Sequence, residues 1–382
     1  MKIKIDIQSA LYYIIYMKPE KNAKNIIGKN IEYFRKRLKY TRKKIAEIME
    51  VNPSLITYYE QGKRVPTIGK LDKMAEIFGV PVEWLMMERP QDIQFAARSK
   101  GKETKPEIKE ILFFQKMMID FVDLLSKIGI PDYKYKGPRY PAQKPKPGIA
   151  EIVKKLLGLP DIIFYEKFKE MLHVNFNVYI FEIPFKNENI SGVTFYREEV
   201  FCVFINKGHT KQRCFFSLAH ELGHILFHIA DDSYLVSRLA STNPFEKEAN
   251  QFANMLLLPE KHFNRVVDKK NLHLYKKEYI QELADFFHVS PESVFYSLAK
   301  KGLVQYNWKS YKPETTYPGN YKKEWTYNDL PWMYILTAYL AYQQDIVSLS
   351  RFSQLLFTDI REAQQIIKKL DEILENSPNN EH

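Results

Sequence analysis

Two histidines and a glutamate interrupt an apolar helical pattern over residues 212–229. His220 and His224 are four residues apart, so both imidazoles lie on one face of a helix, with Glu221 beside them. Burying these groups without partners would be costly, and a metal ion supplies a partner for both rings. The segment therefore predicts a buried helix that carries two ligands of a Zn²⁺ ion, with Glu221 placed to accept a proton from water.

A zinc site that performs chemistry uses three protein ligands and one open position, so a third ligand must come from elsewhere. The segment from Phe245 to Leu257 has a second apolar helical face, and Glu246 and Glu248 lie at its start. Either carboxylate could reach the metal. Asn250, one turn after Glu246, could orient a ligand from behind.

The chain has 382 residues, which is too long for one ordinary core and suggests two or three domains. Its net charge is +11, and residues 1–90 hold 18 Lys and Arg against 10 Asp and Glu. We therefore expect one basic module, with an anionic partner such as nucleic acid, attached to a larger and nearly neutral body. Two cysteines exclude a disulfide scaffold and a cysteine-rich metal site.

Residues 1–27 are expected to be an N-terminal extension, and Met1 and Met17 are both candidates for the true start. Residues 10–17 are apolar but short and tyrosine-rich, and no small-residue cleavage site follows, so secretion is not expected. No apolar run reaches the roughly eighteen residues of a membrane-spanning helix. We expect a cytoplasmic protein with no membrane partner.

Residues 28–90 have the pattern of five short helices. Thr41 can cap the second helix, and Asn52 with Pro53 can open the third. The stretch from Thr41 to Met86 (TRKKIAEIMEVNPSLITYYEQGKRVPTIGKLDKMAEIFGVPVEWLM) resembles the Xre/Cro family of helix-turn-helix proteins. The resemblance implies that the third helix enters the major groove of double-stranded DNA.

Carried over position by position, the resemblance implies a set of DNA contacts. The residues that face the bases are Pro53, Ser54, Leu55, Thr57 and Tyr58. Those near phosphates, which position a protein without reading sequence, are Arg42, Lys43, Lys63 and Arg64. Bidentate readout of a base needs Arg, Lys, Asn or Gln, and the base-facing set has none. We therefore expect DNA binding with weak base discrimination; a dimerisation or protein-docking module is the alternative.

Residues 148–304 are expected to form an α+β domain. Two helices, over residues 148–157 and 164–172, precede three strands over residues 176–183, 191–196 and 200–205. The two helices that carry the metal-site residues follow. A last helix pair, Tyr279–Val304, resembles a helix-turn-helix but lacks basic residues before Lys300, so we interpret it as packing.

Residues 91–147 are expected to be a linker followed by a connector helix over residues 107–128. Residues 305–382 are expected to begin with a polar loop and to continue with helices over residues 331–343, 348–357 and 359–376. The function of this C-terminal helical region is not readable, and a packing domain or a homodimer interface is the simple interpretation. The predicted fold class is thus α+β, mostly α.

The motif HELGH at 220–224, followed by E-x-E-A-N-x-F-A-x-x-L-L-x-P from Glu246 to Pro259, resembles the ImmA/IrrE family of metallopeptidases. The resemblance implies a zincin-like, gluzincin-type protease domain with a small antiparallel sheet, an active-site helix and a third ligand on the following helix. The E-x-x-A spacing of gluzincins favours Glu246 over Glu248. The strand ending near Asn206 would be the family's edge strand, which binds the substrate backbone by strand addition.

The implied function is a DNA-binding transcriptional regulator that carries a zinc-dependent endopeptidase. Its protein substrate would be a repressor or antitoxin in a stress or mobile-element response, and Glu221 would move the proton during hydrolysis. The alternative is a regulator or antitoxin-like protein whose protease fold is a sensor or scaffold with little or no proteolysis. The oxyanion-stabilising group stays open: conceivable residues, each more readily interpreted as structural, are Tyr196, His209, His228 and His262.

Overall fold

The computed structural model describes most of the chain, namely residues 22–80, 82–86, 105–141, 143–229, 234–238, 244–267, 277–304 and 326–375. Most of the expected N-terminal extension, the first part of the linker and the loop before the C-terminal helices lie outside these residues. The chain divides into two compact units, one made of residues 1–95 and 100–116 and the other of the remainder. Each unit is described by itself.

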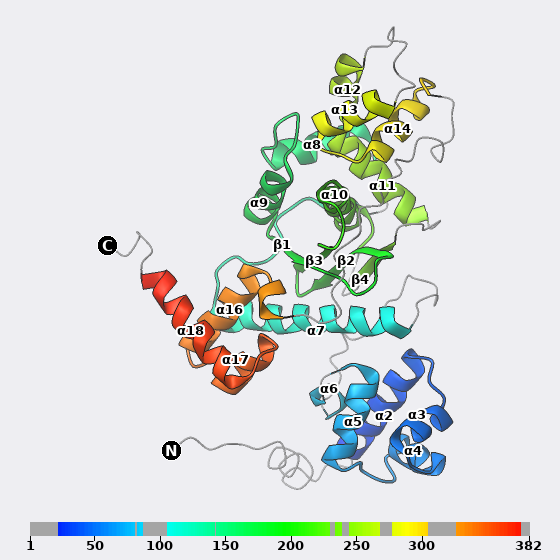
Figure 1. The fold of residues 1–382 in the computed structure, drawn as a ribbon, viewed down its shortest axis with the longest axis vertical. Helices are drawn as coiled ribbons and strands as arrows, with labels where there is room; N and C mark the ends of the chain where they lie inside the picture. Colours follow the sequence, from blue (N-terminus) through cyan, green and yellow to red (C-terminus); the bar gives the residue numbers. More distant parts are fainter. Residues whose placement is uncertain are drawn as a thin grey trace. The chain divides into compact units, whose positions relative to one another are not determined.

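The first unit contains the predicted bundle of five short helices (Figure 1): α2 (Asn22–Arg37), α3 (Arg42–Met49), α4 (Pro53–Glu60), α5 (Ile68–Phe78) and α6 (Glu83–Met86). The predicted caps are present: Thr41 accepts the Lys44 N–H, and Asn52 accepts the Ser54 N–H. The apolar faces of the helices meet in a core of fully buried side chains, including Ile31, Phe34, Leu38, Ile45, Ile56 and Leu71.

The second unit is built around a four-stranded sheet with the strand order β1-β3-β2-β4. The strands are β1 (Val178–Ile183), β2 (Ile190–Arg197), β3 (Val200–Asn206) and β4 (Tyr234–Arg238). β2 is antiparallel to β3 and β4, but β1 is parallel to β3. The expected antiparallel sheet is therefore wrong in one pairing. The tight β2–β3 hairpin, with Glu198 and Glu199 at positive φ, returns the chain between β2 and β1 and so makes β3 parallel to β1.

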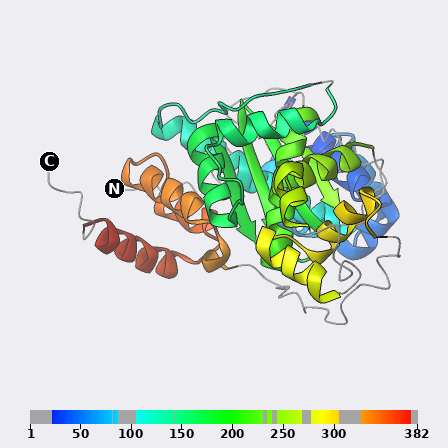
Figure 2. The same ribbon diagram turned by 90° about the horizontal axis from the view of Figure 1, so that it is seen from above.

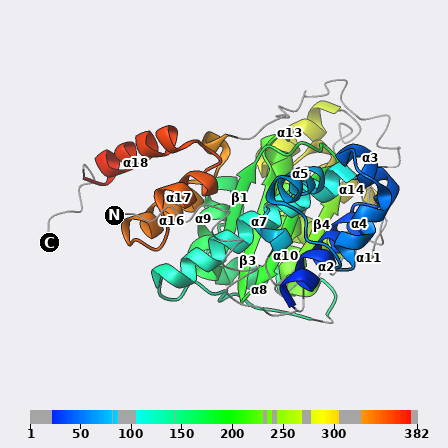
Figure 3. The ribbon, with the colours of Figure 1, turned by 90° about the horizontal axis from the view of Figure 1, so that it is seen from below.

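Helices cover both faces of this sheet, so β3 is buried at every position and is continuously apolar instead of alternating. One face of β3 joins the core that includes residues of α10 (Lys211–Phe227), through Phe201, Val203 and Ile205. On the other face, Phe204 stacks on Phe181, which contacts Phe121 of α7 (Lys105–Ile128). The part of α7 from Met117 on belongs to this unit, and Figure 3 looks onto the face of the sheet that this part covers. Figure 2 shows the helices of residues 147–300 above the opposite face.

The remaining helices of the second unit include the predicted ones in the predicted order, together with α12 (Glu260–Val266) and the 3-10 turn η4 (Tyr327–Asp329), which were not predicted. The predicted ones are α8 (Pro147–Leu156), α9 (Tyr165–Phe176), α11 (Pro244–Leu257), α13 (Lys277–Phe287), α14 (Pro291–Lys300), α16 (Trp332–Gln343), α17 (Leu349–Leu355) and α18 (Ile360–Glu375). Of the three expected C-terminal helices, α16 and α17 contact α7, where Tyr334 stacks on Phe121 and Arg351 pairs with Asp120, and α18 packs on α17. Among the described helices, none has the length and apolar character needed to cross a membrane.

α10 and α11 cross at backbone contact distance. A Cβ on Gly223 would lie 3.1 Å from Cα of Ala249 and 3.3 Å from the ring of Phe252. A residue without a side chain is therefore required where α10 meets α11. This close approach brings the start of α11 next to the two histidines of α10.

Gly223→Ala should destabilise the second unit by about 1–3 kcal/mol, because the added methyl group forces two helices apart. Gly148→Ala is the matched control: a Cβ there meets no atom within 4 Å, so the change should be neutral or stabilise the unit by up to about 1 kcal/mol. Urea unfolding of the metal-free protein, followed by circular dichroism, measures both effects. Equal unfolding midpoints for Gly223→Ala and the parent chain would contradict the close packing.

Candidate metal centre

Three buried side chains from two helices meet at one point. His220 and His224 project from one face of α10, and Glu246 comes from the first turn of α11. The two Nε2 atoms are 3.0 Å apart, and the Glu246 carboxylate lies 3.4 Å from His220 Nε2 and 3.2 Å from His224 Nε2. In the described part of the chain, this cluster brings three potential ligands close enough together to hold a metal ion.

Hydrogen bonds behind each ring fix the ring protons. His220 Nδ1 lies 2.8 Å from Oδ1 of Asn250, which accepts, so Nδ1 carries the proton. His224 Nδ1 lies 2.9 Å from Nδ1 of His228, whose Nε2 lies 3.1 Å from the Glu248 carboxylate. Because Glu248 accepts the Nε2 proton of His228, His228 Nδ1 accepts the proton of His224. Both ligand rings therefore aim unprotonated Nε2 atoms at the same point.

Two lone pairs and a carboxylate at this spacing repel one another unless a cation lies between them. Burial lowers the pKa of His224 to about 4, so this ring is neutral near pH 7. Burial favours a higher pKa for Glu246, but its close contacts with the two imidazoles outweigh burial and lower the pKa to about 2, so this group is a carboxylate near pH 7. Burial disfavours the charged form of His220, but the contact with Glu246 outweighs burial and raises the pKa of His220. When no metal ion is bound, a proton on His220 can therefore take the place of the metal between the ring and the carboxylate. Two imidazoles and a carboxylate fit a Zn²⁺ ion with three protein ligands.

Glu221 lies on α10 next to the two histidines and faces β2. Its side chain is fully buried, and the hydroxyl of Thr194 donates a hydrogen bond to its Oε2. A Cβ on Gly192 would lie 2.5 Å from its Oε1. Gly192 therefore leaves the space that the carboxylate occupies, and Thr194 fixes its orientation. These two β2 residues hold a potential proton acceptor beside the ligand set.

The structure brings the predicted metal-site residues together. Glu246 is the carboxylate beside the two histidines, whereas Glu248 bonds His228. Asn250 bonds one of the histidines from behind, as expected of a residue that orients a ligand.

The expected edge strand at Asn206 is wrong. Asn206 ends β3, which lies inside the sheet between β1 and β2. Its buried side chain accepts the N–H groups of Phe185 and Gly208 and donates to the carbonyl of Ile190. Asn206 thus holds the turns around the strand ends together, and the structure gives no support for a substrate contact there.

Three features of the site were not predicted from the sequence. β4, which pairs with β2, is an edge strand of the sheet. Gly192 supports Glu221, and a glycine inside a strand pattern was the available indication, since it often marks a close approach. His228 supports His224, and the four-residue spacing between them was the indication there.

Of the four residues considered for oxyanion stabilisation, His228 is the one that belongs to this cluster. The other three have contacts elsewhere: His209 Nε2 lies 3.0 Å from the Glu188 carbonyl, His262 pairs with Asp161, and Tyr196 packs on Phe201.

The basic residues of the first unit fall into two groups. Lys43, Lys63 and Arg64 are exposed to solvent. Arg42 is exposed as well, but its Nε donates to buried Glu60 and lies 2.7 Å from the carboxylate, with which Arg35 also pairs. This shared ion pair leaves less of the Arg42 charge for a DNA phosphate.

The residues of α4 that the resemblance places against the bases use their polar groups internally. The hydroxyl of Ser54 donates to Oδ1 of Asn52, and the hydroxyl of Thr57 donates to the carbonyl of Pro53. Tyr58 is 45% exposed and is the large side chain that α4 presents to solvent. Weak base discrimination stays a prediction.

Family models match both units. A model described as the IrrE N-terminal-like domain of the M78 peptidases matches residues 175–299, and a helix-turn-helix model matches residues 31–85. The chain joins a helix-turn-helix domain to an M78 peptidase domain. No curated protein matches the chain. M78 peptidases are metallopeptidases, so the match supports a metallopeptidase-type enzyme, and the helix-turn-helix domain supports DNA binding.

Replacing the ligand Glu246 should weaken zinc binding more than replacing His228 or Glu248, which lie behind the ligand His224. Glu246→Gln should prevent stoichiometric zinc binding, whereas His228→Phe should lower zinc affinity about 10–100-fold, because His224 loses its orienting partner. Glu248→Gln should have a smaller effect than Glu246→Gln. Competition with a chromogenic chelator measures each affinity.

His262→Phe is the control, since His262 pairs with Asp161 and lies outside the ligand cluster. Equal zinc affinities for His228→Phe and the parent chain would show that the contact behind His224 has no orienting role.

Proposed function

We propose that the M78 domain is a zinc-dependent endopeptidase and that the helix-turn-helix domain binds double-stranded DNA. His220, His224 and Glu246 would be the zinc ligands. The observation that carries the proposal is the position of Glu221, a buried carboxylate held beside the ligands by β2. A purely structural zinc site has no need of such a carboxylate.

Zinc held by the three ligands would supply Lewis-acid activation of water and of the scissile carbonyl. Glu221 would accept a proton from the attacking water and return it to the leaving amine. Thr194 restrains one oxygen of this carboxylate, and Gly192 makes room for the other. The base would thus need little reorganisation when the substrate reacts.

β4 is the place proposed for an extended substrate chain. It is an edge strand of the described sheet, and its inner neighbour β2 carries the two residues that contact Glu221. Strand addition to β4 would bind the peptide backbone through main-chain hydrogen bonds. The substrate we propose is a repressor or antitoxin, cut by a cytoplasmic regulator in a stress or mobile-element response.

One observation favours a second candidate function. His224 and Glu221 have no exposed surface, and His220 and Glu246 are each only 5% exposed. A site closed to this degree would suit a sensor or scaffold that binds metal and a partner with little turnover. The two functions share the metal site, and they differ in whether Glu221 acts as a general base in peptide hydrolysis.

Glu221→Gln should keep stoichiometric zinc and lower peptide cleavage about 10²–10⁴-fold, because the general base is lost while the ligands stay. Expression of this variant in cells, followed by identification of the proteins that stay bound, would reveal the substrate. Glu170→Gln, at an exposed glutamate of α9, is the control and should cleave normally. Identical cellular phenotypes for Glu221→Gln and the parent chain would favour the scaffold function.

DNA affinity should fall steeply with salt, because phosphate contacts dominate binding. Lys43→Ala, Lys63→Ala and Arg64→Ala should each weaken binding to all sequences alike and reduce the slope of log affinity against log salt by about 1. Fluorescence anisotropy at several salt concentrations measures this slope. Lys73→Ala, an exposed lysine of α5, is the control. A salt-insensitive interaction would exclude the DNA-binding proposal.

A further inference from the structure

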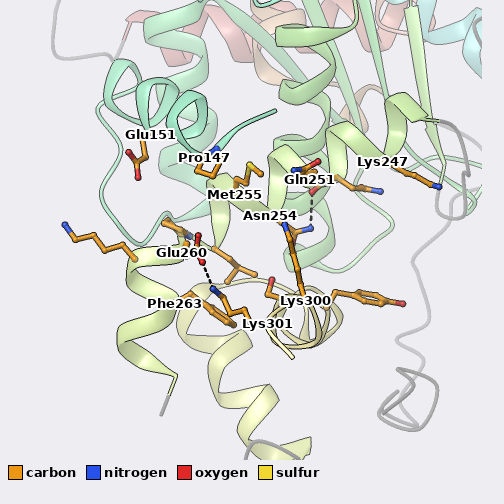
Figure 4. A pocket seen from close by; sticks show the side chains of 16 residues that line it. Pro147, Glu151, Lys247, Gln251, Asn254, Met255, Glu260, Phe263, Lys300 and Lys301 are labelled. Carbon is orange, nitrogen blue, oxygen red and sulfur yellow. Dashed lines mark hydrogen bonds and ion pairs between the residues drawn. The ribbon is translucent and has the colours of Figure 1, made fainter. Parts of the chain in front are cut away.

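A cavity of about 750 Å³ lies between α8, α11, α12 and α14, and neither the three metal-site residues nor Glu221 lines it. Figure 4 shows it from close by, with Gln251 and Asn254 of α11 on one side and Lys300 and Lys301 of α14 on the other. Its volume is within the range of small-molecule sites. The proposed peptidase chemistry gives this cavity no role.

The cavity combines an apolar surface with an excess of positive charge. Met255, Leu258 and Phe263 contribute apolar surface. The charged side chains are those of Lys247, Lys261, Lys300, Lys301, Glu151 and Glu260. Lys301 pairs with Glu260 at 2.8 Å, and the other three lysines form no ion pair with the described residues. Such a lining favours a ligand with an apolar body and a negative charge.

Asn254 provides a polar contact point in this cavity. Its Nδ2 donates to the carbonyl of Asn250 at 3.0 Å, while its Oδ1 is buried and accepts no hydrogen bond from the described residues. A buried acceptor left without a donor costs about 1–3 kcal/mol. A ligand with an N–H or O–H group would satisfy it once the Asn254 side chain turns and presents this oxygen to the cavity.

Asn250 connects the cavity with the metal centre. It lines the cavity, and its Oδ1 accepts the Nδ1 proton of His220. Glu246, Asn250 and Asn254 follow one another at intervals of four residues, so they share one face of α11. A ligand in the cavity would contact two residues of this row, and the third is the carboxylate of the metal site.

We propose that the cavity is a regulatory site for a small amphipathic acid that carries a hydrogen-bond donor. Its anionic group lies near Lys247 and Lys300, its apolar chain lies on Met255 and Leu258, and its N–H or O–H donates to Asn254. Binding changes the affinity of the metal centre for zinc through Asn250. This site is separate from the proposed peptidase site, so either can fail without the other.

N-decanoylglycine is the probe, because it combines a carboxylate, an amide N–H and an apolar chain. Isothermal titration calorimetry on the full chain should show binding at one site. The methyl ester of the probe, which lacks the charge, and decanoate, which lacks the N–H, should each bind at least 10-fold more weakly. No binding of the probe, or equal binding of the ester, would overturn the proposal.

Two variants of the cavity locate the site. Lys300→Met should lower the affinity for the probe at least 5-fold, and Ser297→Trp should abolish binding by filling the cavity from α14. Lys155→Met is the matched control at an exposed lysine of α8 that does not line the cavity, and it should bind like the parent chain. An unchanged affinity in both cavity variants would place the probe elsewhere and overturn the assignment.

The link to the metal centre has its own readout. The affinity for the probe should differ at least 3-fold between zinc-free and zinc-loaded protein, and zinc affinity should change by the same factor when the probe is present. Asn250→Ala should remove this difference while the cavity still binds the probe. Equal probe affinities with and without zinc would overturn the coupling.

Discussion

The crossing of α10 and α11 is the constraint on which the metal centre depends. Gly223 lets the two helices meet at backbone distance, against Ala249. At this distance the first turn of α11 can present Glu246 to the two histidines of α10. The same crossing encloses charged and polar groups in an apolar core, which is tolerable only if they bind one another or a cation. Packing and chemistry therefore depend on the same contact between helices.

The ligands and the proposed base are held by different parts of the fold. His220 is oriented by Asn250, and His224 by His228, so the ligands depend on α10 and α11 alone. Glu221 is oriented by β2, through Thr194 and Gly192. A small displacement between the sheet and the helix pair would therefore move the base while leaving the metal site intact. Such a division suits a peptidase whose turnover is controlled separately from its metal content.

The features that were predicted correctly from the sequence depend on residues that lie close together in the chain. The spacing of His220 and His224, the caps at Thr41 and Asn52, and the apolar faces of the helices depend on residues within one or two turns. The errors concern pairing between distant segments. The resemblance placed the strand of Asn206 at an edge, and the strand itself does not encode its place in the strand order. β4 was not predicted as a strand. Two of the contacts that fix ring protons, His220 with Asn250 and His228 with Glu248, also join segments that are distant in the sequence.

The first unit shows why net charge alone is a poor guide to DNA recognition. Its basic residues include Arg42, whose charge is shared with Glu60. The hydroxyl protons of Ser54 and Thr57 are bonded within the α4 region. A single copy would therefore bind phosphates more effectively than it reads bases. Helix-turn-helix proteins gain selectivity by placing two copies on half-sites one helical turn apart, where phosphate contacts fix the register of each copy. Weak base readout is thus compatible with a specific operator if the chain binds as a homodimer.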